Sequence, residues 1–424
     1  MGKVISLIDA NNFYASCEQS INPSLIGRPL VVLSNNDGCI IARNTEARKL
    51  GIAMGQPYFK IRYDLEALGV VVRSSNYELY GDISKRLMNI LKENCEAIEI
   101  YSIDEAFALF SRQHNYELHS WAQQLRAKTS QYLGIAISIG IGKTKSQAKI
   151  ANYLAKTIPY HAGIFNLNVD NEADSWLKKV PIEKVWGIGK KLSEWCRTKG
   201  ITNALQLRDM PSNELSERYG ITGIRIQQEI KGIECLPLII KSQLKKETCV
   251  SRSFSRPITS LEELRQAIST HVARASEKLR EQKQYANVIT IFIQTNRFLP
   301  FYYSNSATKK LIVASNDTAN LIKESLPLLE RIFRPNYSFT KAGVLLQHLQ
   351  RTSHLQNNLL ATENIEEQQR KEKLMQTIDN LNHQYGNGTI KWAICGNNQD
   401  WDMQRKQLSK ASTTRIEDIP RVKA

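Results

Sequence analysis

Three carboxylates stand where they could hold divalent cations. Asp104 and Glu105 are adjacent and have apolar residues on both sides, while Asp9 ends a separate apolar run over residues 4–8. Carboxylates carried on neighbouring strands can bind two divalent ions about 3.5–4 Å apart, the geometry that drives in-line displacement at phosphorus. The three acids therefore predict metal-assisted phosphoryl-transfer chemistry, if the fold brings them together.

The adjacent pair also predicts its own local structure. Successive side chains of a flat strand point to opposite faces, so Asp104 and Glu105 cannot both face one site from the middle of a strand. They can do so from a hairpin turn, with residues 98–103 as one arm and residues 106–110 as the other. The alternative is a polar turn without chemistry, since acidic residues are common in turns. The pair alone favours that alternative, and Asp9 reverses the preference.

Composition narrows the class of partner. The chain has 424 residues, which indicates two to four folding units, and its 57 Lys and Arg against 41 acids give a net charge of +16. A globular protein this basic usually binds a polyanion, nucleic acid or an anionic membrane. No apolar stretch approaches the ~20 residues of a spanning helix, and no secretory signal opens the chain, so we expect a cytoplasmic protein without membrane partners. No two of the seven cysteines have C-x-x-C spacing, which disfavours zinc.

The elements that must position the acids follow from periodicity. We expect strands at 4–9, 30–33, 98–103, 106–110 and 135–141, with helices at 45–50, 84–93, 118–132 and 146–156. This pattern predicts an α/β unit with a mainly antiparallel sheet. Short helices follow from about 174 to 234. Gly187 and Gly189 precede one of them, which would suit a DNA phosphate, although a simple helix–helix turn is equally consistent.

The second half of the chain differs in charge. Residues 236–244 read as a linker, and residues 245–350 resume an α/β pattern with a helix at 261–283, a strand at 287–295, a helix at 319–332 and a strand at 341–346. This stretch has 16 Lys and Arg against 8 acids, which indicates a phosphate-gripping surface; a merely solvated basic domain is the alternative. Residues 351–424 are polar and contain a helix-like segment at 363–381.

Several motifs together resemble one enzyme family. Residues 9–18, 101–106 and 46–55 resemble the two catalytic motifs and the fingers motif of Y-family translesion DNA polymerases. Residues 34–39, 75–80, 185–189 and 249–254 and the ending of the chain resemble the UmuC type within that family. The resemblance implies a fold of the α/β (α+β) class, built as a right-handed polymerase. The implied domains are a palm (1–18 and 78–165), fingers (19–77), a thumb (166–235), a linker (236–244), a little finger (245–350) and a C-terminal interaction region (351–424).

The same resemblance implies roles for single residues. Asp9, Asp104 and Glu105 would bind two Mg²⁺ ions, and Tyr14 would be the steric gate that excludes ribonucleotides. Arg48 and Lys156 would bind the triphosphate. Thr45 would assist them, although many relatives have a tyrosine at this position, three residues before the arginine. Tyr14 is otherwise a core aromatic at the start of a helix. Of three other lysines, Lys143, Lys145 and Lys149, we expect contacts to the duplex at most.

The resemblance also implies partners. These are primer-template DNA, deoxynucleoside triphosphates, a UmuD′-type dimer and a recombinase filament, in error-prone translesion synthesis without proofreading during an SOS-type response to DNA damage. Gln356, Leu359 and Leu360 resemble a weak sliding-clamp-binding peptide, although a polar linker with two leucines is nearly as good an interpretation.

Two other functions compete with the polymerase interpretation. A nucleotide cyclase built on a similar palm would not need 250 further residues with a basic domain. A non-catalytic DNA-binding subunit would be favoured by loss of an acid, but all three acids are present. A regulatory interaction role of the C-terminal segment is compatible with the polymerase interpretation.

Overall fold

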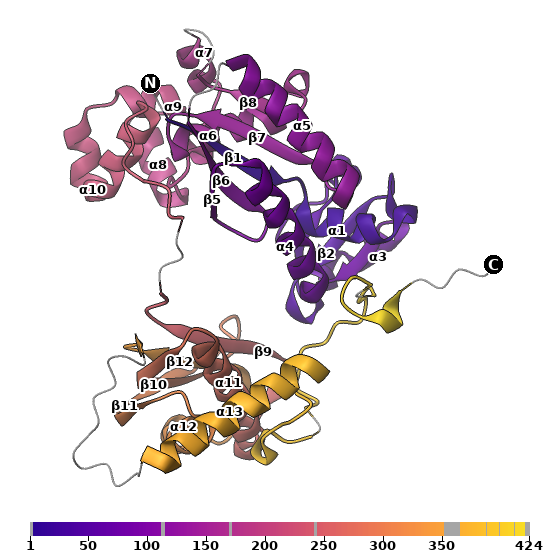
Figure 1. The fold of residues 1–424 in the computed structure, drawn as a ribbon, viewed down its shortest axis with the longest axis vertical. Helices are drawn as coiled ribbons and strands as arrows, with labels where there is room; N and C mark the ends of the chain where they lie inside the picture. The colour runs from indigo at the N-terminus through magenta and orange to yellow at the C-terminus, as the bar shows by residue number, and fades with distance from the viewer. Residues whose placement is uncertain are drawn as a thin grey trace. The chain divides into compact units, whose positions relative to one another are not determined.

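The computed structural model forms two compact units, described here separately (Figure 1). Unit 1 comprises Met1–Ser242 together with Lys406–Ala424, and unit 2 comprises Gln243–Arg405. The structure describes residues 3–111, 115–168, 172–240, 244–351, 365–386, 388–397, 399–410 and 412–419. Among these residues, no helix is both long enough and apolar enough to cross a membrane.

The centre of unit 1 is a five-stranded sheet, the palm sheet, with the order β5-β6-β1-β7-β8. Its strands are β1 (Lys3–Ala10), β5 (Ala97–Ile100), β6 (Glu105–Ser111), β7 (Ile137–Gly142) and β8 (Ile164–Asn166). Every pair is antiparallel except β7–β8, which confirms the expectation of a mainly antiparallel sheet. The predicted hairpin is also confirmed, because β5 and β6 pair directly across residues 101–104.

Alternating side chains of β1 bury two different cores. Ile8 and Ala10 belong to a cluster with apolar residues of α4 (Tyr77–Asn94) and α5 (Asn115–Leu133). Ile5 and Leu7 point to the opposite face and pack with Ala148 of α6 (Lys145–Thr157). The sheet is therefore covered by helices on both faces, and Asp9 lies in register with the face that α6 covers.

The expected fingers form a separate small sheet with the order β3-β2-β4. It contains β2 (Leu30–Leu33), β3 (Ile40–Arg43) and β4 (Val71–Ser74), with helices α2 (Thr45–Lys49) and α3 (Tyr58–Ala67). The chain enters it through α1 (Phe13–Ile21). The expected thumb consists of α7 (Ala173–Lys178), α8 (Lys190–Thr198), α9 (Ala204–Asp209) and α10 (Ser212–Ile230). Helix α10 is interrupted at Gly220, whose φ of 59° only glycine adopts easily.

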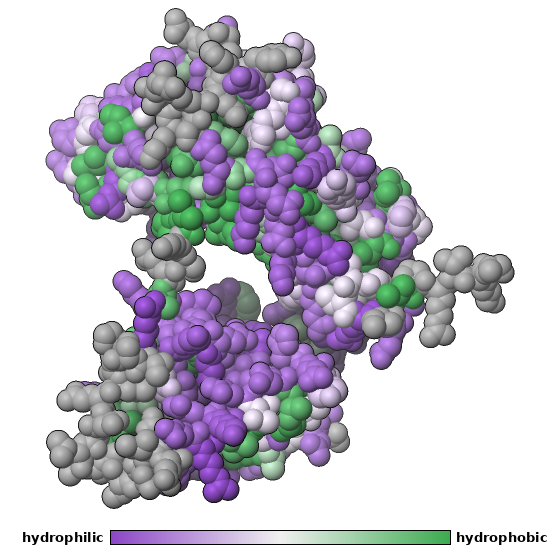
Figure 2. Space-filling view, viewed as in Figure 1, coloured by the Kyte–Doolittle hydropathy of each residue, from purple (hydrophilic) through white to green (hydrophobic). Residues whose placement is uncertain are grey.

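Unit 2 is built on a four-stranded antiparallel sheet with the order β11-β10-β12-β9. The strands are β9 (Thr248–Ile258), β10 (Gln284–Thr295), β11 (Ser304–Ser315) and β12 (Phe339–Gln347), and a short β13 (Gln350–Arg351) also pairs with β10. Helices α11 (Leu261–Glu281) and α12 (Thr318–Ile332) supply much of its core. Hydrophilic residues cover most of the face of unit 2 that is visible in Figure 2.

The C-terminal region contributes to both units. Helix α13 (Ile365–Tyr385) is joined to α11 by two bonds, of 2.6 and 2.7 Å, from the Arg280 guanidinium to the Asp379 carboxylate. Trp401 is 3% exposed and belongs to the core of unit 2. Residues from Lys406 onward instead belong to unit 1.

Candidate active site

The strand register brings two of the predicted acids together. Asp9 on β1 is the direct antiparallel partner of Glu105 on β6, so their side chains lie on the same face of the palm sheet. The two carboxylates are close enough for each to change the pKa of the other. Residues 96 positions apart in sequence thus form one acidic pair.

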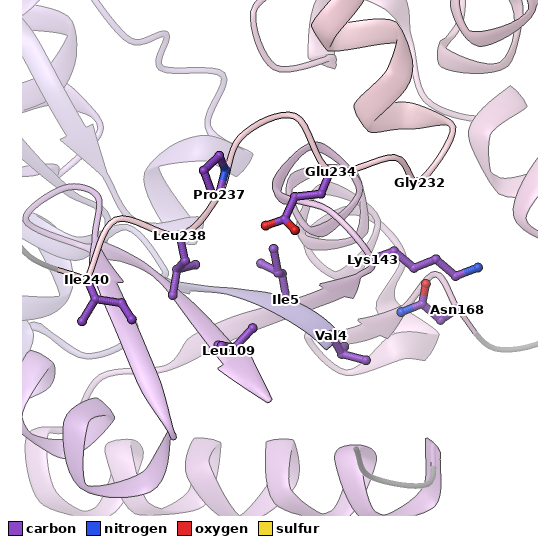
Figure 3. Close-up of a pocket in the computed structure, with 10 residues that line it drawn as sticks. All are labelled: Val4, Ile5, Leu109, Lys143, Asn168, Gly232, Glu234, Pro237, Leu238 and Ile240. Carbon is purple, nitrogen blue, oxygen red and sulfur yellow. The ribbon is translucent and has the colours of Figure 1, made fainter. Parts of the chain in front are cut away.

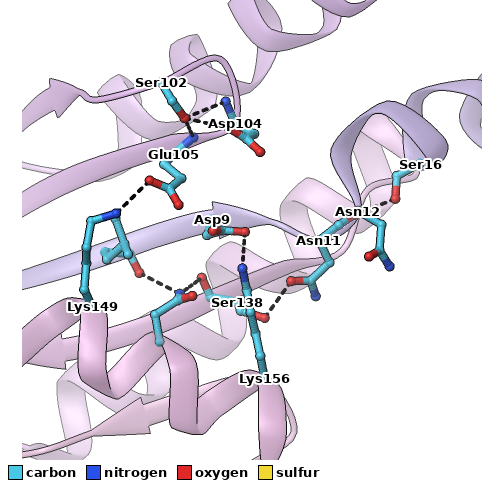
Figure 4. Close-up of polar contacts among 12 residues, drawn as sticks. Asp9, Asn11, Asn12, Ser16, Ser102, Asp104, Glu105, Ser138, Lys149 and Lys156 are labelled. Atoms are coloured by element: carbon cyan, nitrogen blue, oxygen red, sulfur yellow. Dashed lines mark hydrogen bonds and ion pairs between the residues drawn. The ribbon is translucent and has the colours of Figure 1, made fainter. Parts of the chain in front are cut away.

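The third acid, Asp104, lies in the turn immediately before β6. The hydroxyl of Ser102 donates to Asp104 Oδ1 at 2.6 Å, and Ser102 Oγ accepts the backbone N–H of Glu105 at 3.0 Å. The backbone carbonyl of Asp104 accepts the N–H of Ala10 at 2.9 Å, which ties this turn to the end of β1. A serine-stabilised turn therefore places Asp104 next to the acidic pair (Figure 4).

Helix α6 presents a polar stripe to these acids. Lys156 Nζ lies 2.5 Å from Asp9 Oδ1, and Lys149 Nζ lies 3.0 Å from Glu105 Oε2. Positions seven apart lie on the same side of an α-helix, and Asn152 between them donates to the carbonyl oxygen of Ser138 on β7 at 2.9 Å. Figure 4 shows both lysines directed at the carboxylates. Lysine ammonium groups therefore balance part of the acidic charge.

Burial and mutual contact change the acidity of the pair. Burial raises the pKa of Asp9 to about 7, although the charge of Lys156 acts in the opposite direction. Burial acts to raise the pKa of Glu105 as well, but its hydrogen bond with Asp9 and the charge of Lys149 outweigh this, so the pKa of Glu105 is lowered. The two carboxylates therefore influence each other's titration, and Asp9 binds a proton more strongly than Glu105 does.

Lys149 occupies an aromatic surround that the sequence did not reveal. Its ammonium lies 4.5 Å from the ring centre of Tyr101, 5.5 Å from that of Trp186 and 5.8 Å from that of Phe107. Ring faces attract cations, and here they hold the lysine beside Glu105. Lys149 therefore lies beside the candidate acids, while its expected contact with the duplex stays a prediction.

Lys145 has a structural position as well. It is 3% exposed, its ammonium lies 2.5 Å from Glu99 Oε2, and it donates to the backbone carbonyl of Pro237 at 3.0 Å. Glu99 also accepts the backbone N–H of Ile239 at 2.6 Å. The expectation of a duplex contact is wrong for Lys145, because its side chain is buried and paired with Glu99. Its bonds instead attach the segment after the thumb to the palm sheet.

The donor chemistry of the site fits a hard divalent cation. All three acids offer carboxylate oxygens, which Mg²⁺ prefers. Within the described ranges, no three Asp, Glu, His or Cys side chains lie close enough together to hold a metal ion by themselves. Lys149 and Lys156 supply positive charge beside Glu105 and Asp9.

Tyr14 lies on α1, one helical turn beyond the end of β1. Its ring stacks on the ring of Tyr80 with a centroid separation of 4.6 Å and an interplanar angle of 17°, and it meets the edge of Tyr77 at 6.1 Å. Burial, followed by Tyr77 and Asp104, raises the pKa of its phenol. Tyr14 is therefore a partly buried ring held near the acids. One side of the ring packs against Tyr80, as the interpretation as a core aromatic expects, but the ring is not buried completely.

The predicted triphosphate contacts lie on α2. Thr45 and Arg48 are three residues apart, so they share a face of this helix, and both are exposed. The Arg48 guanidinium donates to the side-chain oxygen of Asn12 at 3.4 Å. Asn12 has a left-handed φ of 50° between β1 and α1, a strained conformation of the kind that concentrates at functional sites. The pair Arg48 and Asn12 connects the fingers to the palm.

The glycines of the thumb have a clear backbone reason. Gly187 has a φ of 88°, and a Cβ atom there would lie 2.7 Å from the Cδ1 atom of Ile226. Gly189 is the N-cap of α8, and no side chain caps this helix. These features account for the glycines as a turn, while the phosphate contact stays a prediction. The expected clamp-binding residues Gln356, Leu359 and Leu360 lie outside the described residues.

A pocket on the palm lies away from the acids. It is lined by the first residues of β1, by Leu109, and by the segment that follows the thumb, including Pro237 and Leu238 (Figure 3). Val4 and Ile5 are four or five residues from Asp9 along β1, a separation of roughly 13–16 Å at the rise of a strand. Its lining is mainly apolar, and the segment after the thumb forms one of its walls. We therefore do not assign the catalytic site to this pocket.

Four family models match the chain. Residues 8–153 match the impB/mucB/samB family, residues 170–201 its HHH motif, and residues 245–359 its C-terminal domain. Residues 372–422 match a domain of unknown function. The matched ranges include the candidate acids, the first two helices of the thumb and most of unit 2.

Curated relatives and solved structures agree with these matches. The chain is 39% identical to UmuC of Salmonella typhimurium over 99% of this chain and 100% of the relative, and 34% identical to MucB of Escherichia coli over 98% and 99%. A Y-family DNA polymerase chimera superposes with a TM-score of 0.67 at 22% identity, covering 82% of this chain and all of that one. An insertion ternary complex of Dbh DNA polymerase has a TM-score of 0.55 at 22% identity over the same shares. The fold is thus that of the Y-family polymerases, and the chain belongs to the impB/mucB/samB family as a member of the UmuC type.

Proposed function

We propose that this protein extends a DNA primer across damaged template by Mg²⁺-dependent nucleotidyl transfer at Asp9, Asp104 and Glu105. Membership of the family makes it a DNA-directed DNA polymerase of the error-prone, translesion kind. The observation that carries the proposed site is the cross-strand pair of Asp9 and Glu105, with Asp104 in the adjoining turn. This arrangement places two carboxylates side by side on a rigid sheet and the third in the adjoining turn.

The acids and lysines have complementary tasks in this proposal. When two Mg²⁺ ions are bound by the acids, they supply Lewis-acid stabilisation for the attacking and leaving oxygens. Lys156 already neutralises Asp9 at 2.5 Å, and its side chain is 36% exposed, so it can also attract the phosphates of an incoming nucleotide. Arg48 offers an exposed, planar guanidinium for bidentate phosphate contacts, and Thr45 offers a hydroxyl on the same face of α2.

Tyr14 would act as the steric gate for the sugar. Its ring is braced on one side by the stacked ring of Tyr80, which leaves the other side to limit the space near the acids. A 2′-hydroxyl would collide with such a ring, whereas a deoxyribose would fit. Burial raises the pKa of the phenol, which favours its neutral form further.

Tolerance of damaged template follows from small fingers. The fingers consist of three short strands and two helices, and residues 35–41 around Gly38 would lie over the templating base. A small and open cover selects weakly by shape, which permits insertion opposite distorted bases at the cost of accuracy. The 16 basic residues within 245–350 would hold the primer-template backbone.

The partners of the reaction include DNA and deoxynucleoside triphosphates. A solved relative of the same fold was described as an insertion ternary complex, which supports both. We further propose a UmuD′-type dimer and a recombinase filament as protein partners, as the resemblance to the UmuC type implies. A weak sliding-clamp contact through Gln356, Leu359 and Leu360 belongs to the same proposal.

The test is primer extension on an undamaged template and on a template with an abasic site, with Mg²⁺ or with EDTA. Wild type is compared with Asp104→Asn, which keeps the shape of the side chain and removes one charge, with UmuD′ and activated recombinase supplied. Asp174→Asn removes the same charge from an exposed pair with Arg208 and is the matched control. We expect Mg²⁺-dependent insertion that Asp104→Asn abolishes while DNA binding persists. Insertion by Asp104→Asn at the wild-type rate would contradict the assignment of the acids.

A further inference from the structure

A buried carboxylate lies on α1, away from the candidate catalytic acids. Glu18 is 1% exposed, and its Oε1 atom accepts the phenol hydroxyl of Tyr80 at 2.6 Å and the hydroxyl of Ser409 at 3.0 Å. The Arg73 guanidinium lies 4.0 Å from its other oxygen. A buried carboxylate is costly unless such donors surround it. Ser409, which is 391 positions away in sequence, is therefore part of the immediate surroundings of Glu18.

Glu18 is linked to the proposed sugar gate by one side chain. Tyr80 is fully buried, donates to Glu18 and stacks on the ring of Tyr14. Tyr14 and Glu18 are also one helical turn apart on α1, so they lie on the same side of that helix. The orientation of the Tyr80 ring, which braces Tyr14, is thus fixed at its far end by the Glu18 carboxylate.

The segment that carries Ser409, residues 406–410, is called here the C-terminal strap. Its backbone extends the edge of the fingers sheet, because the N–H of Ser74 at the end of β4 donates to the carbonyl of Gln407 at 3.0 Å. The N–H of Gln407 donates to Ser74 Oγ at 2.9 Å, and the N–H of Lys406 donates to Asp37 Oδ2 at 2.9 Å. These bonds place the strap in one register on unit 1.

Asn76 fixes Ser409 within that register. Its side-chain nitrogen donates to the carbonyl oxygen of Ser409 at 3.1 Å and contacts the hydroxyl oxygen at 3.0 Å, while its side-chain oxygen accepts the N–H of Leu79 in the first turn of α4. Tyr80 lies in the same turn. Asn76 therefore has two roles. It caps the N-terminus of α4, the helix that carries Tyr80, and it orients the Ser409 hydroxyl that donates to Glu18.

The strap is held by polar bonds more than by apolar burial. Lys406, Gln407, Leu408 and Lys410 are all exposed, whereas Ser74, Asn76 and Glu18 beneath the strap are 0–2% exposed. A segment that only covered a hydrophobic patch would bury its leucine. The contacts instead converge on the hydrogen bonds that orient Glu18 and α4.

We infer that the C-terminal strap positions the Tyr14 gate through Ser409, Glu18 and Tyr80, and so contributes to the selection of deoxyribonucleotides. The inference rests on the proposed role of Tyr14. It gives a task to residues of the matched domain of unknown function, whose range includes the strap. Ser409 is a positioning residue here, since it contacts neither the nucleotide nor the catalytic acids.

The experiment measures nucleotide binding without turnover. Full-length protein is bound to a primer-template with a dideoxy-terminated primer, and the Kd values of the matching deoxyribonucleotide and ribonucleotide are measured for each variant. Ser409→Ala removes one donor to Glu18, Ser409→Thr retains a hydroxyl, and Tyr80→Phe removes the other donor. Ser412→Ala is the matched control, because the hydroxyl of Ser412 donates to the backbone of Asp418 instead.

We expect the ratio of the ribonucleotide Kd to the deoxyribonucleotide Kd to fall about three- to tenfold in Ser409→Ala and in Tyr80→Phe, the size of one ordinary net hydrogen bond. The change should come from tighter ribonucleotide binding, with the deoxyribonucleotide Kd nearly unchanged. Ser409→Thr and Ser412→Ala should keep the wild-type ratio.

Tyr14→Ala separates the two possible failures. A ratio unchanged by Tyr14→Ala would remove the gate and, with it, the task given to the strap. A ratio that falls in Tyr14→Ala but not in Ser409→Ala or Tyr80→Phe would leave the gate in place and overturn the inference about the strap. Parallel weakening of both nucleotides in Ser409→Ala would also overturn it, since that result indicates general support of the fold.

Discussion

Gly140→Ala should disturb the active site through the backbone of a helix. Gly140 lies on β7 beneath α6, and a Cβ atom there would lie 2.0 Å from the backbone nitrogen of Asn152 and 2.4 Å from the carbonyl oxygen of Ala148. Ordinary contact begins near 3.4 Å, so α6 must retreat by about 1.4 Å. Backbone atoms cannot turn aside as a side chain can.

The displacement acts directly on the lysines of α6. Lys149 and Lys156 contact Glu105 and Asp9 at 3.0 and 2.5 Å, and a shift of this size would lengthen both contacts beyond hydrogen-bond distance. Overpacking costs about 1–3 kcal/mol of stability. A misplacement of about 1 Å in a catalytic constellation can cost roughly 100-fold in rate. We therefore expect the loss of insertion rate to exceed what partial unfolding explains.

The assay is single-nucleotide insertion at a temperature where both proteins are folded, alongside urea unfolding. Gly81→Ala is the matched control, because Gly81 lies inside α4 and a Cβ atom there meets nothing within 4 Å. That substitution should stabilise α4 by up to about 1 kcal/mol, through helix propensity. Wild-type stability and wild-type insertion in Gly140→Ala would refute the reasoning about the close approach of α6.

Two further predictions concern buried titratable groups. His271 in α11 is 4% exposed, and burial followed by the charge of Arg252 lowers its pKa to about 4. The unfolded state binds the proton more readily, so the free energy of unfolding is highest above pH 6.5 and falls as the pH falls toward 4, by about 2 kcal/mol at pH 5. Urea unfolding at pH 7 and pH 5 should show a smaller difference in the free energy of unfolding for His271→Leu than for wild type. An equal difference would exclude His271 as the source. Lys145→Met should destabilise unit 1 by about 3–5 kcal/mol, because it leaves the largely buried Glu99 carboxylate without its lysine partner. The double variant Lys145→Met/Glu99→Leu should recover much of that loss in the same unfolding assay. An unchanged free energy of unfolding in Lys145→Met would contradict the importance of the pair.

Much of the palm could be predicted because its pattern is local. The apolar run before Asp9 and the two arms around Asp104 specify strands, and the hairpin needs only a short turn to place the acids. Helices α5, α6, α11 and α12 were likewise predicted within about three residues of their observed bounds, whereas α4 begins seven residues before its predicted start and the long α10 was expected only as short helices. Periodicity reports which face of a segment is buried, and these segments have one dominant face.

Other features depend on partners that are distant in sequence. Strands β9 and β11 were not predicted, since many of their side chains are exposed and their alternation is irregular. The burial of Lys145 depends on Glu99 and on the segment after the thumb, and the surroundings of Glu18 depend on Ser409. A lysine or a glutamate gives no sign in sequence that a partner far along the chain will bury it.

The path of the chain through the two units has an evolutionary consequence. Unit 2, Gln243–Arg405, is an insertion between two segments of unit 1, because the strap returns to the fingers sheet. In terms of chain entropy, the strap closes a loop that contains a whole folded domain. The cost of closing a flexible loop grows only logarithmically, by about 0.6 kcal/mol for each doubling of its length. Descendants of such a chain could lengthen or shorten the connections of the inserted domain while the strap keeps its register on unit 1.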